Sequence, residues 1–194
     1  QLLAAAWWLR ARGLDRDSGA LLERAVKAHP AANLFAYALG EHLRNTDTGS
    51  DAQTDYSRAR GLLSRLVAEG STWRGARLLV ASMDEEAERQ TEAWQGAEQV
   101  LAAAPGDADA LLIQHRIAVR REWRAEAADR IERARAAAPG RTDVLRSAIE
   151  FYRAQRAASA LAAALAESAA RNPLDEDWPE FLGASGRVDE ARAA

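Results

Sequence analysis

The amino-acid sequence is poor in residues that would point to a particular chemistry. It contains no cysteine, which excludes disulfide bonds and thiolate chemistry. Aromatic residues make up 6% of the chain, so a single deep aromatic core is not expected. The 12 glycines and 5 prolines are sparse and lie between apolar stretches, and β-branched residues form no runs. Because alanine, the strongest helix former, supplies much of the apolar content, the composition predicts an all-α protein.

The chain also lacks a strong excess of charge of either sign. Its formal net charge is −3, which argues against a general nucleic-acid binder, because such proteins need a strong cationic field. Lys27 is the only lysine among the 26 lysine and arginine residues. We interpret this as the codon bias of a GC-rich, bacterial genome. Arginine also suits the recognition of carboxylates and phosphates.

No apolar run approaches the roughly 18 residues that suggest a transmembrane helix. The alanine-dominated stretch 157–170 is shorter and is broken by polar residues. No signal peptide is recognisable, so a cytoplasmic and a periplasmic location both remain open. Because the chain begins at Gln1, we expect that a leader was removed or that this is a piece of a longer protein.

A regular spacing of prolines is what the sequence does contain. Pro105, Pro139 and Pro173 each follow an alanine-rich run and precede a polar turn, and they are 34 residues apart. A fixed period of this length is typical of stacked repeats, and the apolar residues between the prolines recur at helical spacing. One helix pair cannot bury its apolar face alone, so stacking of neighbours is expected.

The residues before these prolines resemble the tetratricopeptide repeat, a 34-residue helix–turn–helix unit. The second helix of that repeat has a small residue, a large one four later, a small one three beyond and a proline five further. Ala127, Ile131, Ala134 and Pro139 match all four positions. Three further segments match more loosely, namely Ala59, Leu63, Leu66 and Ser71; Ala93, Ala97, Val100 and Pro105; and Leu161, Leu165, Ser168 and Pro173.

This resemblance implies an α-solenoid of stacked antiparallel helix–turn–helix repeats that forms a right-handed superhelix. Gly13 lies 17 residues before Pro30, the family's spacing from the inter-helix glycine to the terminal proline, so the register reaches the start of the chain. We predict one array over 1–194. Its repeats are placed at approximately 1–32 (partial), 33–73, 74–107, 108–141, 142–175 and 176–194 (partial). Because both end repeats look incomplete, we expect a fragment of a longer solenoid.

The repeat 33–73 is seven residues longer than the others. The polar stretch 45–55 is expected to hold the excess as a lengthened loop between two helices. The Leu39-Gly40 pair just before it matches a leucine–glycine pair of the family's first helix. The other repeats have different residues in place of this glycine, namely Ala81, His115 and Ile149.

The resemblance also implies a partner-binding groove lined by the first helix of each repeat. The family's groove positions fall on twelve residues: Tyr37, Glu41, Arg44, Leu78, Ser82, Glu85, Leu112, Arg116, Arg120, Arg146, Glu150 and Arg153. The four arginines of the C-terminal half could bind a carboxylate or a phosphate through paired N–H donors. Alternatively, Arg116, Arg146 and Arg153 pair with Asp143 and Glu150 on adjacent helices, as charged faces commonly do.

An acidic run from Asp84 to Glu86 precedes the arginine-rich stretch. It could steer a basic or dipolar partner, or it could be a solvated turn between helices. His29, His42 and His115 are far apart in sequence, without metal-ligand spacing, and we interpret them as structural or surface residues. The sequence therefore predicts no metal and no cofactor.

Two short strings imitate enzyme motifs. Residues 47–50, Asp-Thr-Gly-Ser, resemble an aspartic-protease triplet but have no second copy, and residues 183–186 lack the five-residue frame of a nucleophile elbow. We therefore predict no enzyme activity. The predicted function is a protein–protein interaction scaffold that binds a peptide or partner subunit, favouring acidic side chains or a C-terminal carboxylate. The alternative is a structural spacer in a larger bacterial protein whose activity lies in another domain.

Overall fold

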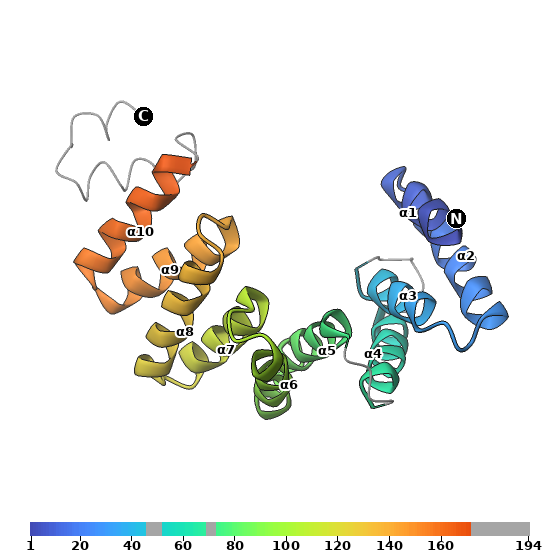
Figure 1. Cartoon of the computed structure of the whole chain (residues 1–194), viewed down its shortest axis with the longest axis horizontal. Helices are drawn as coiled ribbons and strands as arrows, with labels where there is room; N and C mark the ends of the chain where they lie inside the picture. Colours follow the sequence, from blue (N-terminus) through green and yellow to red (C-terminus); the bar gives the residue numbers. More distant parts are fainter. Residues whose placement is uncertain (46–51, 69–72, 172–194) are drawn as a thin grey trace. The chain divides into compact units, whose positions relative to one another are not determined.

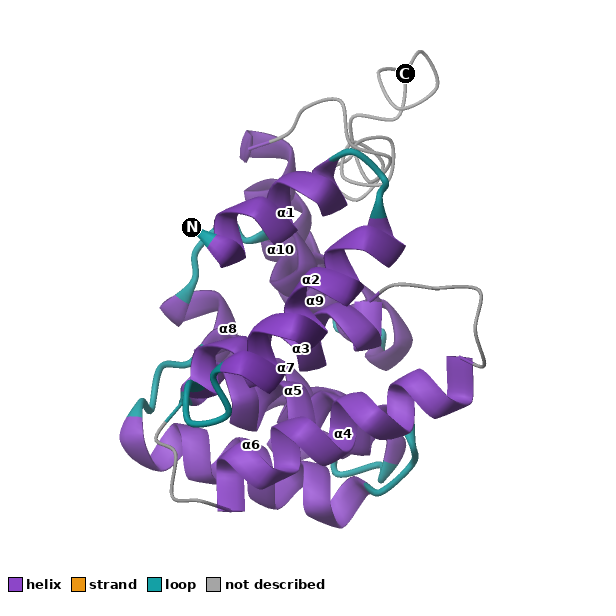
Figure 2. Cartoon of the chain, turned by 90° about the vertical axis from the view of Figure 1, so that its right-hand side faces the viewer, coloured by secondary structure: helices purple, strands orange, loops and turns teal. Residues whose placement is uncertain are grey.

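A computed structural model describes residues 1–45, 52–68 and 73–171. Every regular element in these residues is an α-helix (Figures 1 and 2), which confirms the all-α prediction. The helices are α1 (Leu2–Ala11), α2 (Asp15–Ala28), α3 (Asn33–Asn45), α4 (Ala52–Ala68), α5 (Arg74–Glu86), α6 (Gln90–Ala103), α7 (Ala108–Arg120), α8 (Arg124–Ala137), α9 (Thr142–Gln155) and α10 (Ala158–Arg171). None of these helices is both long enough and apolar enough to cross a membrane.

The helices follow one another in pairs. Within pairs, α1 packs on α2, α3 on α4, α7 on α8 and α9 on α10. Short turns make α1 and α2, α7 and α8, and α9 and α10 antiparallel. Between pairs, α2 contacts α3, α4 contacts α5, and α9 contacts both α7 and α8. This is the arrangement of an α-solenoid, so that part of the prediction is confirmed. The chain divides into two compact units, Gln1–Gly96 and Ala97–Ala194.

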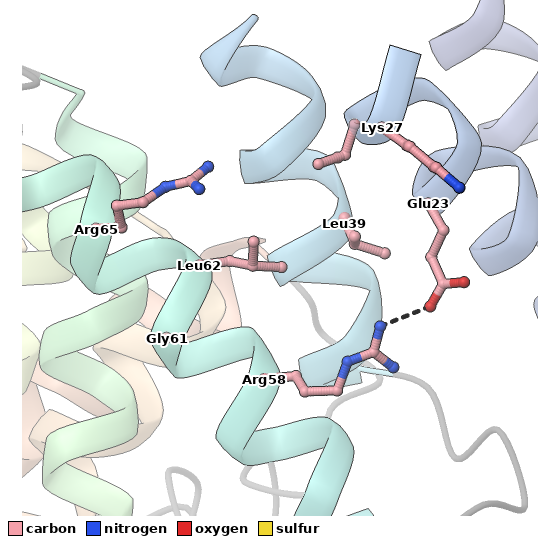
Figure 3. A pocket seen from close by; sticks show the side chains of 8 residues that line it. Glu23, Lys27, Leu39, Arg58, Gly61, Leu62 and Arg65 are labelled. Atoms are coloured by element: carbon pink, nitrogen blue, oxygen red, sulfur yellow. Dashed lines mark hydrogen bonds and ion pairs between the residues drawn. The ribbon is translucent and has the colours of Figure 1, made fainter. Parts of the chain in front are cut away.

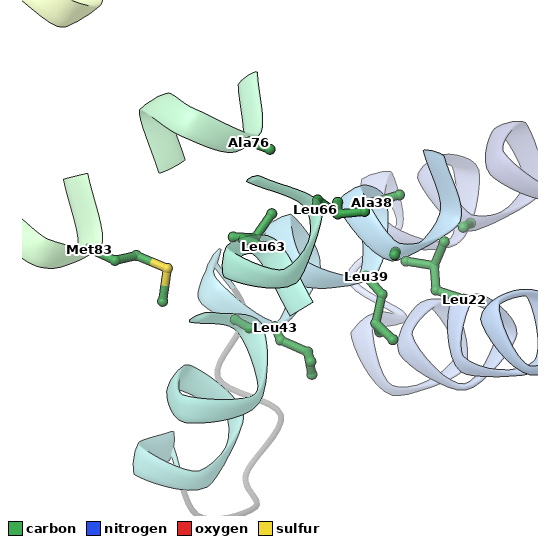
Figure 4. Close-up of a cluster of buried hydrophobic side chains, with 11 residues drawn as sticks. Leu22, Ala38, Leu39, Leu43, Leu63, Leu66, Ala76 and Met83 are labelled. Carbon is green, nitrogen blue, oxygen red and sulfur yellow. The ribbon is translucent and has the colours of Figure 1, made fainter. Parts of the chain in front are cut away.

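The core of the first unit is made of leucine and alanine side chains and includes one methionine (Figure 4). Leu39, Leu43, Leu63 and Met83 lie in this cluster and are almost completely buried. Small residues let the helices approach closely: a Cβ added to Gly40 in α3 would lie 2.8 Å from Leu63 Cγ in α4. The Leu39-Gly40 pair therefore marks a close contact between the two helices.

The buried residues of the second unit follow the predicted register. Ala127, Ile131 and Ala134, which match the repeat pattern, all have an exposed fraction of 0%. Ile117 of α7 and Ile149 of α9 are buried with them. The apolar residues that recur at helical spacing in the sequence are thus the residues that stack the helices.

The turn inside each of four pairs has the same backbone conformation. The residue in the left-handed region is Gly13 in the first pair, with φ of 73°, but Glu88, Glu122 and Arg156 in later pairs, with φ of 54–59°. In each turn the next N–H donates to a carbonyl five residues earlier, for example Trp123 N to Ala118 O at 2.8 Å. This is the Schellman cap of a helix C-terminus. The last three of these residues are 34 apart, so the repeat period also governs turns that lack glycine.

The loop predicted at 45–55 is shorter than expected. Asn45 still belongs to α3 and α4 begins at Ala52, so part of the seven extra residues lengthens α4 instead. The first turn of α4 is held by contacts: Asp55 is buried, and the Tyr56 hydroxyl donates to the Met83 carbonyl at 2.7 Å. Residues 46–51 and the predicted partial repeat at 176–194 lie outside the described residues, as do Ser71 and Pro173.

Candidate functional site

Six predicted groove residues lie on α3 and α5 of the first unit, and two of them contact each other. Arg44 donates to Ser82 Oγ at 2.8 Å and also forms an ion pair with Glu86. Because both partners lie on α5, Arg44 joins the two first helices. Leu78 and Glu85 have exposed fractions of 9% and 4%, so they offer little surface to a partner.

Tyr37 and Glu41 complete the predicted set on α3. The Tyr37 ring meets the Trp73 ring edge to face, with centroids 5.7 Å apart, and its hydroxyl would be 2.8 Å from a Cβ added to Gly75. Burial, with the nearby Glu41 carboxylate, raises the pKa of Tyr37 above its ordinary value. Tyr37 is therefore packed against the start of α5 and stays protonated at neutral pH.

The acidic run at the end of α5 is divided: Asp84 and Glu85 are buried, whereas Glu86 is exposed. Asp84 is only 4% exposed and accepts hydrogen bonds from Arg60 Nε at 3.0 Å and Nη2 at 2.8 Å. Arg89 forms a second ion pair with it, at 2.8 Å. A buried carboxylate is stable only when it is paired and hydrogen-bonded, and here two arginines provide this. Asp84 is thus not part of a solvated turn but joins α4 to α5.

The second unit contains a pocket between its two first helices, α7 and α9, with a volume of about 290 Å3. Its lining residues are His115, Arg116, Val119, Arg120, Ser147, Glu150, Phe151, Ala154 and Gln155. Three of the predicted groove residues, Arg116, Arg120 and Glu150, are therefore brought together. Leu112 is buried, and Arg146 and Arg153 are exposed on α9 but do not line the pocket.

The inner wall of this pocket is made by His115 and Phe151. The His115 Nδ1–H donates to the Ala127 carbonyl at 2.9 Å, and the imidazole meets the Phe151 ring edge to face with centroids 5.2 Å apart. Burial lowers the pKa of His115 below its ordinary value, so the imidazole is neutral at pH 7. The positive charge of the pocket therefore comes from Arg116 and Arg120.

A chain of polar contacts joins α9 to α8 and α8 to α10. The Tyr152 hydroxyl donates to Glu132 on α8, and Arg135 bridges Glu132 at 3.0 Å and Glu167 of α10 at 2.9 Å. Glu167 also accepts the backbone N–H of Gly140 at 3.1 Å. Burial, together with the bond to Glu132, raises the pKa of Tyr152 to about 12. These contacts hold α9 in place behind the pocket.

Searches against family models and curated proteins found no match. Solved structures do match over nearly the whole chain. The pilF protein of Pseudomonas aeruginosa has a TM-score of 0.78 at 12% identity, over 99% of this chain and 86% of its own. TTC0263, a thermophilic TPR protein of Thermus thermophilus, has a TM-score of 0.69 at 17% identity, over 100% of this chain and 98% of its own. This chain has the tetratricopeptide-repeat fold. A further TPR protein, YrrB, described as having an unusual peptide-binding site, has a TM-score of 0.62 at 14% identity, over 95% of this chain and 90% of its own.

In this tetratricopeptide-repeat fold, α7 and α9 are first helices of successive repeats, and the pocket between them includes three of the twelve predicted groove residues. Val119 and Phe151, the two large apolar residues of the pocket, were not among the predicted groove residues. Val119 follows His115 by four residues and thus lies on the same helix face, which was the available signal. Its exposed fraction is 45%, high for a large apolar residue.

The described residues contain no group of three or more His, Cys, Asp or Glu side chains that could hold a metal ion. The string at 47–50 that imitates a protease motif lies outside the described residues, and so does the string at 183–186.

Proposed function

We propose that this chain is a non-catalytic interaction scaffold that holds a peptide or partner subunit against the first helices of its repeats. The observation that carries the proposal is the pocket between α7 and α9, where Arg116 and Arg120 adjoin Val119 and Phe151. Two arginines beside an apolar surface suit a ligand that is both anionic and apolar. The fold agrees with this function, and YrrB is a protein of the same fold with a peptide-binding site.

The preferred ligand in this proposal is a peptide with acidic side chains or a free C-terminal carboxylate. Guanidinium groups present paired N–H donors that match a carboxylate, and such charge-assisted bonds are stronger than neutral ones. Val119 and Phe151 would contact an apolar side chain beside that carboxylate. Glu150 lines the same pocket, can accept a peptide N–H, and disfavours a second negative charge near it.

The test is a selection of random peptides with free C-termini on the whole chain. We expect the bound peptides to be acidic and to lose about tenfold in affinity or more when Arg116 and Arg120 are both changed to alanine. The control is Arg124→Ala on α8, which removes one positive charge from an exposed helix start outside the pocket and is compared with each single variant, Arg116→Ala and Arg120→Ala. Circular dichroism should show that all variants keep their helix content.

Unchanged affinity in the Arg116→Ala/Arg120→Ala variant would remove the pocket from the proposal. Failure to enrich any peptide would favour the structural-spacer alternative instead. Amidation of the peptide C-terminus distinguishes the two forms of anionic ligand, since it weakens binding only where the terminal carboxylate is the bound group.

A further inference from the structure

A second pocket lies in the first unit, away from the predicted groove residues. It has a volume of about 580 Å3 and is bounded by the two second helices α2 and α4, with α3 contributing Leu39 (Figure 3). We propose that this pocket binds an acidic segment of a partner protein that carries a large apolar side chain. The apolar side chain would lie on Leu39 and Leu62, and the acidic neighbours would face Lys27 and Arg65.

The floor of the pocket is aliphatic. Leu62 of α4 points toward Leu39 of α3 in Figure 3, and Val26 of α2 lines the same space. Val26 and Leu62 are partly buried members of the apolar cluster, so each presents a remaining apolar surface to the pocket. Covering such surface fully with one leucine or phenylalanine side chain would tighten a complex by about tenfold or more.

Gly61 keeps this space open. A Cβ added at Gly61 would meet no atom within 4 Å, so packing of the fold does not require glycine there. Gly61 lies inside α4, where glycine is less favourable to the helix than alanine. The aligned positions of the other second helices carry side chains, namely Gln95, Asp129 and Ala163. Glycine at this position is therefore particular to α4 among the second helices compared.

The charges around the pocket select an acidic occupant. Three cationic residues line it, Lys27, Arg58 and Arg65, against one acidic residue, Glu23. Glu23 already accepts a hydrogen bond from Arg58 Nη2 at 2.7 Å, shown by the dashed line in Figure 3. The lining thus has a net charge of +2 in a chain whose net charge is −3. Such local complementarity raises the association rate of acidic partners and penalises basic ones.

The experiment is a peptide-display selection on the whole chain, with counter-selection on Gly61→Leu. This variant fills the pocket and leaves its charges unchanged, whereas the control Gly61→Ala adds one methyl group and should raise helix stability. We expect enriched peptides with acidic residues around a large apolar residue. Their affinity should fall about tenfold or more in Gly61→Leu, but stay within about twofold in Gly61→Ala.

A charge-reversed variant tests the same site without filling it. Lys27→Glu combined with Arg65→Glu should also weaken these peptides about tenfold, and it keeps the test valid if Gly61→Leu does not fold. Arg116→Ala/Arg120→Ala should leave their affinity unchanged, which separates this pocket from the one between α7 and α9. The proposal is overturned if no peptide is enriched, if enriched peptides bind Gly61→Leu as well as wild type, or if they carry no acidic excess. Binding to phosphatidylglycerol vesicles that is lost in Gly61→Leu would identify a membrane as the occupant and also overturn it.

Discussion

The first helices of the pairs α3/α4 and α7/α8 carry different residues at one important packing position, and the two pairs hold together in different ways. In the first unit this position is Gly40, and the absence of a side chain lets Leu63 of α4 pack directly on α3. In the second unit it is His115, which is 3% exposed and donates a hydrogen bond to the Ala127 carbonyl of α8. The fold therefore does not require glycine here. A close contact between backbones and a buried hydrogen-bonding side chain are two solutions to the same packing problem.

The largest expected loss of stability comes from removing the buried His115 side chain. His115→Ala loses a hydrogen bond and leaves a cavity under Phe151, so the free energy of unfolding should fall by about 2–4 kcal/mol. Urea unfolding measures the loss, and hydrogen exchange should locate it in α7 and α8. His115→Gln, which keeps most of the volume and an N–H donor, is the control and should lose about 1 kcal/mol. If His115→Ala lost no more stability than His115→Gln, the imidazole would not be what holds α7 and α8 together.

A smaller loss of stability is expected from disturbing the close contact of α3 and α4 at Gly40. Gly40→Ala places a Cβ at 2.8 Å from Leu63 Cγ, and overpacking of this kind destabilises by about 1–3 kcal/mol. The same substitution at Gly61, which has open space beside it, should instead stabilise α4 by up to about 1 kcal/mol. Thermal or urea unfolding of the two variants gives the comparison.

A double substitution tests the cause. In a Leu63→Ala background the space beside Gly40 is empty, so adding Gly40→Ala should no longer destabilise. If Gly40→Ala were as stabilising as Gly61→Ala in the wild-type background, close contact with Leu63 would not be the reason for glycine at this position.

The sequence was sufficient for the helix pairs and for most of the core. The proline spacing defines the repeat register, and this register predicts Ala127, Ile131 and Ala134 as packing positions. All three are buried. The four left-handed turn residues occupy the same position of the repeat. Only Gly13 could be predicted from its residue type, because glycine favours this conformation and glutamate and arginine do not. At Glu122 the turn is imposed by the packing of α7 on α8, which local propensity does not reveal.

The polar contacts between repeats could not be predicted. Asp84 and Arg60 are 24 residues apart, and their pairing depends on how closely α4 approaches α5, which a one-dimensional pattern does not specify. For the candidate site, the spacing placed Arg116 and Arg120 on one helix face, and both line the pocket. It could not show that Arg146, on a similar face of α9, stays outside the pocket, because the offset between two packed helices decides which side chains share a cavity.

The smallest change in stability is expected from pH, because protonation of a buried histidine leaves the packed side chains in place. Each unit contains one such histidine, His42 or His115. Burial lowers the pKa of His42 in α3, where Arg10 lowers it further and Asp15 and Asp55 raise it, and burial also lowers the pKa of His115. In the unfolded chain both histidines should titrate near 6.5. The unfolded state therefore binds protons first, and the free energy of unfolding should fall as the pH drops below about 6.5 toward the lower folded pKa values.

Urea unfolding at pH 7.5, 6.5 and 5.5 measures this dependence. His42→Gln should reduce the loss of stability in the first unit, and His115→Gln should reduce it in the second, which hydrogen exchange can resolve. Above pH 7 neither histidine contributes, because both states then hold the neutral imidazole. If the double variant loses as much stability between pH 7.5 and 5.5 as the wild type, the buried histidines are not its source. Gly40 and His115 would then differ only in how they pack their helix pairs, and not in any dependence of stability on pH.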